Sequence, residues 1–257
     1  MYKILITDYL PDDAIRILKK ENFEVEYDPE IDRTKLKEKI KEFDGIIVRG
    51  RTKIDKEILK NAKKLKIIVR AGVGLDNIDL DCCNSKNIKV FNTPLAPVSS
   101  VAELTICLIL SLLRNFYEAN KSLKEGKWLK KDLIGYQLKG KTVGIVGVGR
   151  IGSEVARLLT SFGCKIIAYD IDISRKEFIE KIGGEFTTDL NYLLSNSDIV
   201  TIHVTLTSST YKMFSKNTLM KMKKGSFLIN TSRGGVVDEE ALLEMLNSGH
   251  IAGAALD

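Results

Sequence analysis

A glycine-rich segment between a strand pattern and a helix pattern has the clearest chemical meaning in the sequence. It reads GVGRIG, follows the apolar run KTVGIV and precedes VARLLTSF. In such a turn Gly147 permits the tight bend, Gly149 lets the backbone approach a pyrophosphate, and Gly152 lets the helix pack closely on the strand. The free N–H groups at the start of the helix favour phosphates. Glycines also occur in ordinary turns, but the flanking strand and helix favour a dinucleotide site.

A carboxylate follows the next strand pattern. Asp170 comes directly after the run KIIAY, eighteen residues beyond Gly152. At this place a carboxylate accepts hydrogen bonds from the adenosine ribose hydroxyls and repels a 2′-phosphate. The tripeptide that follows, IDI, contains no cation to bind that phosphate. The pattern therefore predicts NAD as the cofactor, in preference to NADP.

An arginine in a glycine turn is the second feature of chemical interest. The run SFLIN predicts a buried strand, and Thr231, Ser232 and Arg233 follow it before two glycines. Because ligands of open α/β sheets bind at the carboxyl ends of strands, Arg233 is expected to project toward the reactive end of the cofactor. A guanidinium can donate two parallel hydrogen bonds to the carboxylate of a planar 2-oxo acid. In isolation, a surface salt bridge is an equally good use for this arginine.

Small residues and arginines after two earlier strand patterns predict an anion site. Residues 71–74 follow the run IIVR, and their N–H groups can form an anion-binding nest. Arg70 stands beside this turn, and Arg49 and Arg51 follow the run GIIV. Together these cations suit a small anionic substrate, although scattered surface charges remain an even alternative.

Composition and charge exclude several classes of protein. The net charge of +6 and the isoelectric point near 9.0 suggest an anionic partner. Lysine and glutamate alternate without a long run of one sign, so a small substrate is expected rather than nucleic acid. Four cysteines without a CxxC, and only two histidines, predict reduced thiols in a cytoplasmic protein and no metal site. The sequence offers no signal peptide, and the most apolar run, residues 101–113, is too short to span a membrane.

Apolar periodicity predicts two successive α/β domains, each a doubly wound parallel sheet. The first, residues 1–98, is expected to be a flavodoxin-like substrate domain, and the second, residues 99–257, a Rossmann domain that binds NAD. A cleft between them would hold the site. The expected strands lie at residues 3–7, 23–27, 45–48, 66–69, 88–91, 142–146, 165–169, 185–187, 199–203, 226–230 and 251–256.

One long helix, from residue 99 or 100 to about residue 124, is expected to open the second domain. Its first half is apolar nearly all round, more than a single packing face can cover. A homodimer through this helix and the arm around Trp128 is therefore expected. The apolar residues behind this expectation are Leu104, Ile106, Leu108, Ile109 and Leu112.

Five stretches resemble the signature segments of the D-2-hydroxyacid dehydrogenases. They are VRAGVGLDNID, NTP followed by SVAE, GKTVGIVGVGRIG, NTSRGGVVDEEAL and SGHIAGAALD, in order along essentially the whole chain. The form RAGVGLDNID and the VRxxTK pattern of Arg49, Thr52 and Lys53 are most similar to the D-3-phosphoglycerate dehydrogenase branch. The resemblance implies NAD-dependent oxidation of D-3-phosphoglycerate to 3-phosphohydroxypyruvate, the first step of serine biosynthesis. A hydroxypyruvate or glyoxylate reductase and a non-catalytic NAD-sensing protein remain alternatives.

The resemblance also assigns roles to single residues. Arg233 matches the catalytic arginine that holds the substrate carboxylate and carbonyl, Arg150 and Ile151 match the pair whose backbone binds the pyrophosphate, and Asp170 matches the ribose acid. The other cofactor contacts that it implies are Val73, Gly147, Gly149, Gly152, His203, Val204, Thr231, Ser232, Arg233 and Asp257. The substrate contacts that it implies are Arg49, Arg70, Ala71, Gly72, Val73, Gly74 and Arg233, with Lys130 as a further phosphate contact across a dimer.

The sequence departs from the family pattern in two places. Gly50 and Arg51 replace a serine and a small residue, and the extra cation favours a phosphorylated substrate. The family pattern continues past Asp257 into VFxxEP and PHIG segments, which supply a Glu–His pair and complete the first domain, and we expect the native gene to encode both. Residues 1–257 alone are expected to bind NAD and to turn over poorly. His203 is expected to pack beside the cofactor without acting as the base, and His250 to face solvent.

Overall fold

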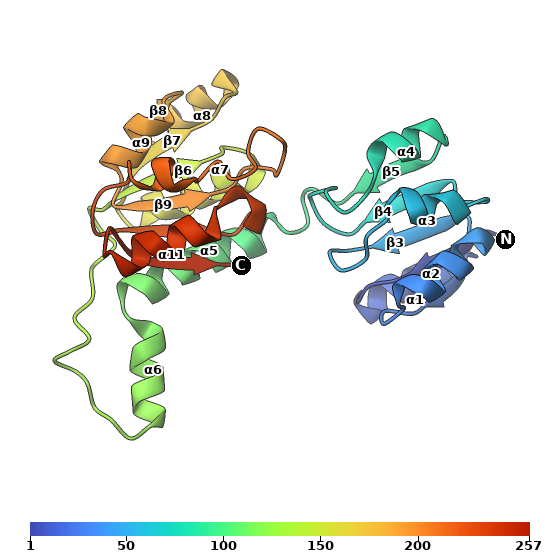
Figure 1. Ribbon diagram of the computed structural model, residues 1–257, viewed down its shortest axis with the longest axis horizontal. Coiled ribbons are helices and arrows are strands. Elements are labelled where there is room, and N and C mark those ends of the chain that lie inside the picture. The colour runs from blue at the N-terminus through green and yellow to red at the C-terminus, as the bar shows by residue number, and fades with distance from the viewer. The chain divides into compact units, whose positions relative to one another are not determined.

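The computed structural model describes residues 1–257 and divides them into two compact units. Unit 1 is Met1–Pro97 and unit 2 is Val98–Asp257, one residue away from the expected boundary. In both units strands alternate with helices and all strand pairs are parallel (Figure 1). The expected α/β class is therefore confirmed.

Unit 1 contains a five-stranded sheet with the order β2-β1-β3-β4-β5. In this flavodoxin-like order the chain reverses direction across the sheet between β1 and β3, and ligands bind at the carboxyl ends of strands near such a point. The strands are β1 (Lys3–Ile6), β2 (Glu24–Tyr27), β3 (Gly45–Val48), β4 (Ile67–Arg70) and β5 (Lys89–Asn92). The helices are α1 (Asp12–Lys20), α2 (Arg33–Lys39), α3 (Lys56–Asn61) and α4 (Leu80–Ser85).

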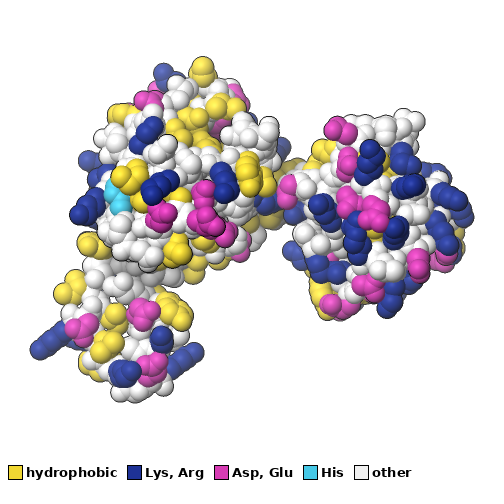
Figure 2. All heavy atoms as spheres, viewed as in Figure 1, with side chains coloured by type: hydrophobic (Ala, Val, Ile, Leu, Met, Phe, Trp, Pro, Cys, Tyr) yellow, Lys and Arg dark blue, Asp and Glu magenta, His cyan; other side chains and the backbone are white.

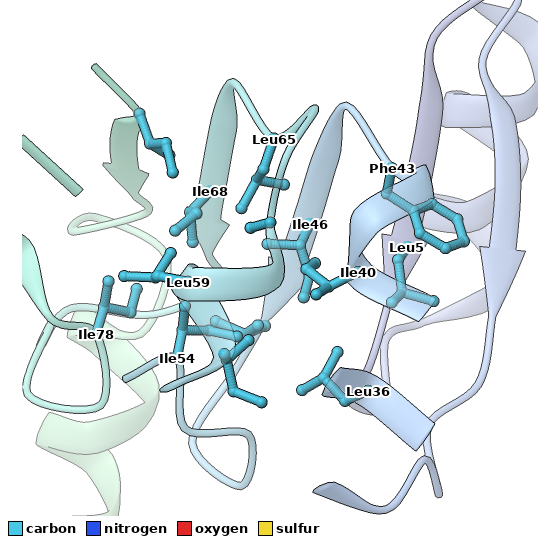
Figure 3. Packing of buried hydrophobic residues seen from close by; sticks show 14 of the residues in the cluster. Leu5, Leu36, Ile40, Phe43, Ile46, Ile54, Leu59, Leu65, Ile68 and Ile78 are labelled. Carbon is cyan, nitrogen blue, oxygen red and sulfur yellow. The ribbon is translucent and has the colours of Figure 1, made fainter. Parts of the chain in front are cut away.

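The core of unit 1 forms where the strands meet α2, α3 and α4. In Figure 3 the strand residues Leu5, Ile46 and Ile68 lie opposite Leu36 and Leu59 from the helices. Each of the three helices begins at an aspartate whose carboxylate accepts a backbone N–H of the first turn, namely Asp32, Asp55 and Asp79. Such caps satisfy donors that a helix cannot satisfy itself, and they contribute about 1 kcal/mol each.

Unit 2 contains a six-stranded sheet with the order β11-β10-β9-β6-β7-β8, which is that of the Rossmann fold. Its crossing point lies between β6 and β9. The strands are β6 (Thr142–Val146), β7 (Lys165–Tyr169), β8 (Glu185–Thr187), β9 (Ile199–Ile202), β10 (Ser226–Asn230) and β11 (Ile251–Leu256). The helices are α5 (Val98–Leu113), α6 (Phe116–Lys124), α7 (Arg150–Ser161), α8 (Lys176–Lys181), α9 (Leu190–Asn196), α10 (Lys216–Leu219) and α11 (Glu239–Asn247).

Helices cover both faces of this second sheet, as expected for parallel strands that are buried on two sides. On one face α5, α7 and α8 pack against side chains such as Val143 and Ile145. On the other face α9, α10 and α11 pack against side chains such as Val146 and Val200. The second core reaches Val146 and Ile202, the last residues of β6 and β9, directly before the loops of the site.

The prediction of one long helix over residues 99–124 was wrong. The structure has two helices, α5 and α6, which are bent by 67° relative to each other. Between them Asn115 takes the left-handed conformation with φ of +50°, and its side-chain amide donates to the carbonyl of Ile134 at 3.2 Å. Asparagine tolerates this conformation better than other non-glycine residues, and the apolar period continues through the break, so the pattern gave no sign of it.

Helix α6 and the segment after it extend from the body of unit 2 (Figure 1). No single helix has the length and apolar character to cross a bilayer, and only the bent pair of α5 and α6 taken together meets that criterion.

Candidate functional site

The glycine loop has the geometry that its sequence predicts. Gly147 has φ of +96°, and a Cβ there would lie 2.9 Å from the carbonyl of His203. A Cβ on Gly152 would lie 1.9 Å from the carbonyl oxygen of Gly147, so only glycine lets α7 start this close to β6. At Gly149, which precedes the first residue of α7, a Cβ would meet nothing within 4 Å. The loop is therefore packed on its inner side and open on its outer side, which fits a pyrophosphate at the start of a helix.

Asp170 lies directly after β7 and contacts the glycine loop. One carboxylate oxygen accepts the N–H of Val148 at 2.6 Å, and the other accepts the N–H of Asp172 at 2.9 Å. Each oxygen has a second lone pair, which can accept a ribose hydroxyl. Asp170 is thus placed for its expected role and also holds the loop that precedes α7.

A hollow of about 450 Å³ opens beside the glycine loop in unit 2. Four of the residues expected to bind NAD line it together with Asp170: Gly147, Gly149, His203 and Val204. Residues that the sequence reasoning missed complete the lining: Tyr169, Ile171, Thr205, Thr207, Ser209, Thr210 and Met213. The only available sign was the hydroxyl-rich run TLTSST, two residues after the end of β9. The hydroxyl of Thr210 fixes this loop by bonds to Thr205 O and Thr207 N.

His203 lies at the carboxyl end of β9, beside the glycine loop. Its backbone N–H donates to Val146 O at 2.8 Å, and its Nε2 lies 2.9 Å from the hydroxyl of Thr201. Burial lowers the pKa of His203 to about 3, so the imidazole is neutral near pH 7. A group with this pKa is a poor base at neutral pH, which agrees with the expectation that His203 packs beside the cofactor.

The turn after β10 is shaped by Asn230, which the sequence reasoning did not single out. Its side-chain amide donates to Arg233 O at 2.9 Å, and its Oδ1 accepts the N–H and the hydroxyl of Ser232 at 3.0 and 2.7 Å. The guanidinium of Arg233 donates to Ser232 O at 2.8 Å and is half-buried. This turn therefore fixes the backbone from which Arg233 projects.

Two further expected contacts lie next to this turn. The hydroxyl of Thr231 lies 3.0 Å from that of Thr105 on α5, and both residues are buried. The N–H of Asp257 donates to Asn230 O at 3.0 Å, which places Asp257 at the carboxyl end of β11 beside β10. Thr231, Arg233 and Asp257 therefore converge at one edge of the unit 2 sheet.

In unit 1 the expected nest lies directly after β4. Gly72 has φ of +151°, and a Cβ there would lie 1.7 Å from Nη1 of Arg70, so glycine lets the guanidinium fold over the turn. The side-chain amide of Asn92 donates to Val73 O at 2.6 Å and holds the turn from β5. The expected role of Ala71 needs correction, because its N–H donates to Val48 O at 2.8 Å. Only Gly72, Val73 and Gly74 can still present their N–H groups to an anion.

The expectation that Arg51 adds a cation for the substrate also needs correction. Its guanidinium donates to Ile31 O at 3.1 Å and to Thr7 O at 2.5 Å, and its Nε lies 3.2 Å from the buried carboxylate of Asp8. These contacts occupy the guanidinium within unit 1. Arg49, in contrast, is exposed, and its side chain makes one bond, to Tyr9 O at 3.2 Å.

Comparison with known proteins places the chain in a family. Residues 106–257 match the family described as D-isomer specific 2-hydroxyacid dehydrogenase, NAD binding domain. The hydroxypyruvate reductase of Thermotoga maritima is 43% identical over 258 residues, which cover 100% of this chain and 82% of that protein. The chain is a member of the D-2-hydroxyacid dehydrogenase family. Its cofactor is NAD, as predicted.

Two other proteins are similar to this chain over nearly its whole length. The D-3-phosphoglycerate dehydrogenase of Methanocaldococcus jannaschii is 45% identical over the whole chain, which spans about half, 49%, of that relative. Among solved structures, D-lactate dehydrogenase from Aquifex aeolicus complexed with NAD and lactic acid matches with a TM-score of 0.87 and 30% identity. That match covers 99% of this chain and 76% of the other.

Lys130 and His250, the two remaining residues with an expected role or position, lie away from the glycine loop and the Arg233 turn. Lys130 is exposed in the segment after α6, where it makes no ion pair. His250, expected to face solvent, is instead half-buried, with its Nε2 in the interior, and it lies at the amino end of β11. The amino ends of the strands lie at the opposite edge of the sheet from Arg233, so His250 is remote from that turn.

Proposed function

We propose that this dehydrogenase interconverts D-3-phosphoglycerate and 3-phosphohydroxypyruvate with NAD. The observation that carries the proposal is that two arginines, Arg49 and Arg70, stand at the carboxyl ends of the neighbouring strands β3 and β4, with Arg70 folded over the Gly72–Gly74 turn. A phosphate monoester carries close to two negative charges near neutral pH, and guanidinium groups with backbone N–H groups bind such an anion.

The residues of this chain contribute binding, orientation and polarisation to the reaction. NAD supplies the hydride acceptor when it is bound. Arg233 orients the substrate through two parallel hydrogen bonds to its carboxylate, and a positive charge beside the C2 oxygen favours the polarised carbonyl of the transition state. The glycine loop and Asp170 hold the cofactor.

The proton of the C2 hydroxyl needs a general acid–base group whose pKa lies near the working pH. We propose that neither histidine of these 257 residues is that group. His203 has a pKa of about 3, and His250 lies at the amino edge of the sheet.

The proposal is tested by binding of D-3-phosphoglycerate to the protein saturated with NAD, measured by calorimetry. Arg233→Lys keeps the charge but loses the planar fork, so it should weaken binding by about tenfold. Arg49→Gln should lower the affinity for D-3-phosphoglycerate. The affinity for D-glycerate, which lacks the phosphate, should stay nearly unchanged. Wild-type affinity in Arg233→Lys would remove Arg233 from the site, and equal losses for both ligands in Arg49→Gln would remove Arg49 from a phosphate site.

A hydroxypyruvate reductase is the second candidate, and one observation favours it. Arg51 is occupied by Asp8 and two carbonyls, so the site has fewer cations than the sequence suggests. An unphosphorylated 2-oxo acid needs no cation beyond Arg233 for its carboxylate. Preference for hydroxypyruvate over its phosphorylated form would establish this second activity.

A further inference from the structure

Asp8 is a buried carboxylate that neither the motifs nor the proposed reaction assigns. It follows β1, next to β3, at the point where the strand order of unit 1 reverses. Only 5% of its side chain is exposed. A buried carboxylate is costly unless it is paired and hydrogen-bonded, so its contacts show what it does.

All the contacts of the Asp8 carboxylate are with residues 49–52, the loop after β3. One oxygen accepts the N–H of Arg49 and, at 3.4 Å, the N–H of Thr52. The other accepts the hydroxyl of Thr52 at 3.0 Å and lies 3.2 Å from Nε of Arg51. One side chain thus collects donors from three of the four loop residues.

Asn77 holds the same loop from the other side. Its side-chain amide donates to the carbonyls of Arg49 at 2.9 Å and Thr52 at 2.7 Å. Asn77 belongs to the loop after β4 that begins with the Gly72–Gly74 turn, and Ile54 N donates to Asn77 O at 2.8 Å. Asp8 accepts N–H groups of the 49–52 loop, and the Asn77 amide donates to carbonyls of the same loop. The loop after β3 and the loop after β4 are therefore held together.

Arg49 itself is oriented by the residue after Asp8, because its guanidinium donates to Tyr9 O at 3.2 Å. We propose that Asp8, with Asn77, is a positioning residue for substrate binding: it holds the 49–52 loop so that the exposed Arg49 meets the anionic group of the substrate. Arg51 belongs to this clamp and is not a ligand. The proposal rests on the proposed function for the identity of the ligand, but not for the clamp.

Asp8→Asn is the sharpest test, because it keeps the shape of the side chain. The new NH2 group must face a donor in either orientation, the two backbone N–H groups on one side or Nε of Arg51 on the other. Asp44→Asn is the matched control, since Asp44 precedes β3 at the opposite end of the sheet, accepts Lys3 N at 3.1 Å and pairs with Lys66 at 3.3 Å. It perturbs a carboxylate of the same unit without touching the loop.

Hydrogen exchange of the amides of residues 49–52 tests the clamp without any ligand. We expect faster exchange in Asp8→Asn and in Asn77→Ala, and wild-type exchange in Asp44→Asn. Calorimetry with NAD and with D-3-phosphoglycerate then tests the consequence. Asp8→Asn should lower the affinity for D-3-phosphoglycerate by about tenfold and leave the dissociation constant of NAD unchanged.

Each result has one meaning. Unchanged exchange of the loop amides in Asp8→Asn overturns the clamp, and unchanged affinity for the acid despite faster exchange overturns the positioning role. The same loss of affinity in Asp44→Asn would show that general destabilisation of unit 1, and not the clamp, causes the effect. If the wild-type protein binds neither D-3-phosphoglycerate nor D-glycerate, the proposed function fails, while the exchange experiment still decides the clamp.

Discussion

Asp170 holds the glycine loop by accepting the N–H of Val148. We expect the same carboxylate to accept the ribose hydroxyls of NAD as well. In Asp170→Ala the free energy gap between NAD and NADP binding should narrow by about 1–3 kcal/mol, because the charge facing a 2′-phosphate is gone. NAD binding itself should also weaken, because the loop loses its contact.

Fluorescence titration with both cofactors measures this gap. Asp172→Ala is the control, since the Asp172 side chain lies two residues away and contacts the N–H of Ser174 and Nε of Arg175 in the short helix that follows. An Asp170→Ala protein that retains the wild-type preference would show that another residue selects the cofactor.

Because burial lowers its pKa, His203 is expected to make the stability of the protein depend on pH. The pKa of His203 is about 3 in the folded protein and near 6.5 in the unfolded chain. Between these pH values the imidazole is protonated in the unfolded chain and neutral in the folded protein. Stability is complete above pH 6.5 and falls by up to about 1.4 kcal/mol for each pH unit between 6.5 and 3. His203→Gln should lack this contribution.

Urea unfolding at pH 6.5 and pH 5.5 measures the effect in both proteins. The loss over this interval should be larger in the wild-type protein than in His203→Gln by up to about 1.4 kcal/mol. The same loss in both would mean that water reaches the imidazole and that burial does not hold it neutral.

At the scale of elements, two glycines of the same loop are expected to serve different purposes: Gly152 the packing of α7 on β6, and Gly149 the binding of NAD. In Gly152→Ala the added Cβ would lie 1.9 Å from Gly147 O, so β6 and α7 must move apart and the melting temperature should fall by several degrees. In Gly149→Ala the Cβ meets no protein atom within 4 Å, so the protein should fold as before but bind NAD at least about tenfold more weakly.

Calorimetric melting and NAD titration of the two variants give the comparison. Equal melting temperatures would contradict the packing role of Gly152. Wild-type NAD affinity in Gly149→Ala would mean that the pyrophosphate does not approach that glycine.

Most elements of both units could be predicted from the sequence, because apolar periodicity, aspartate caps and glycine stops act within a few residues of each other. Eleven strands were expected, and eleven are found. The break at Asn115 could not be predicted, because the left-handed conformation depends on a bond to Ile134, a contact between segments nineteen residues apart.

The candidate site shows the same limit. Gly147, Gly149 and Asp170 were named from a motif, His203 and Val204 from the family resemblance, and all five line one hollow. Arg51 was named as a ligand from its charge alone, but its partners Thr7, Asp8 and Ile31 follow other strands or lie in other loops. Residue type gives the chemistry that a side chain can perform, whereas the sheet order decides which partner it meets first.

At the scale of the whole molecule, apolar surface on unit 2 supports the expected homodimer over part of the region where it was placed, residues 99–124 and the arm around Trp128. Ile106 and Ile109 of α5 are buried in the core of unit 2 and cannot meet a partner. Leu104 of α5 is exposed, as are apolar side chains on α6 and the segment after it, which include Phe116, Tyr117, Leu123, Trp128 and Ile134. Figure 2 shows apolar side chains on this projecting part among charged ones.

We propose that this surface pairs two copies of the chain. Sedimentation at micromolar concentration should give the mass of a dimer, and Trp128→Glu with Leu123→Lys should give a monomer, because charges replace apolar groups that a dimer would bury. Leu95→Lys, an exposed apolar residue of unit 1, is the control and should remain a dimer. A wild-type monomer would contradict the proposal.

The central claim, that a phosphorylated 2-oxo acid is the substrate, is tested most directly by comparing two ligands of the NADH-saturated protein. The dissociation constants of 3-phosphohydroxypyruvate and hydroxypyruvate can be measured by calorimetry at low and moderate salt. We predict that the phosphorylated acid binds at least about tenfold more tightly and that its advantage shrinks as salt rises, because exposed charges are screened over about 8–10 Å. Equal dissociation constants for the two acids would contradict the account.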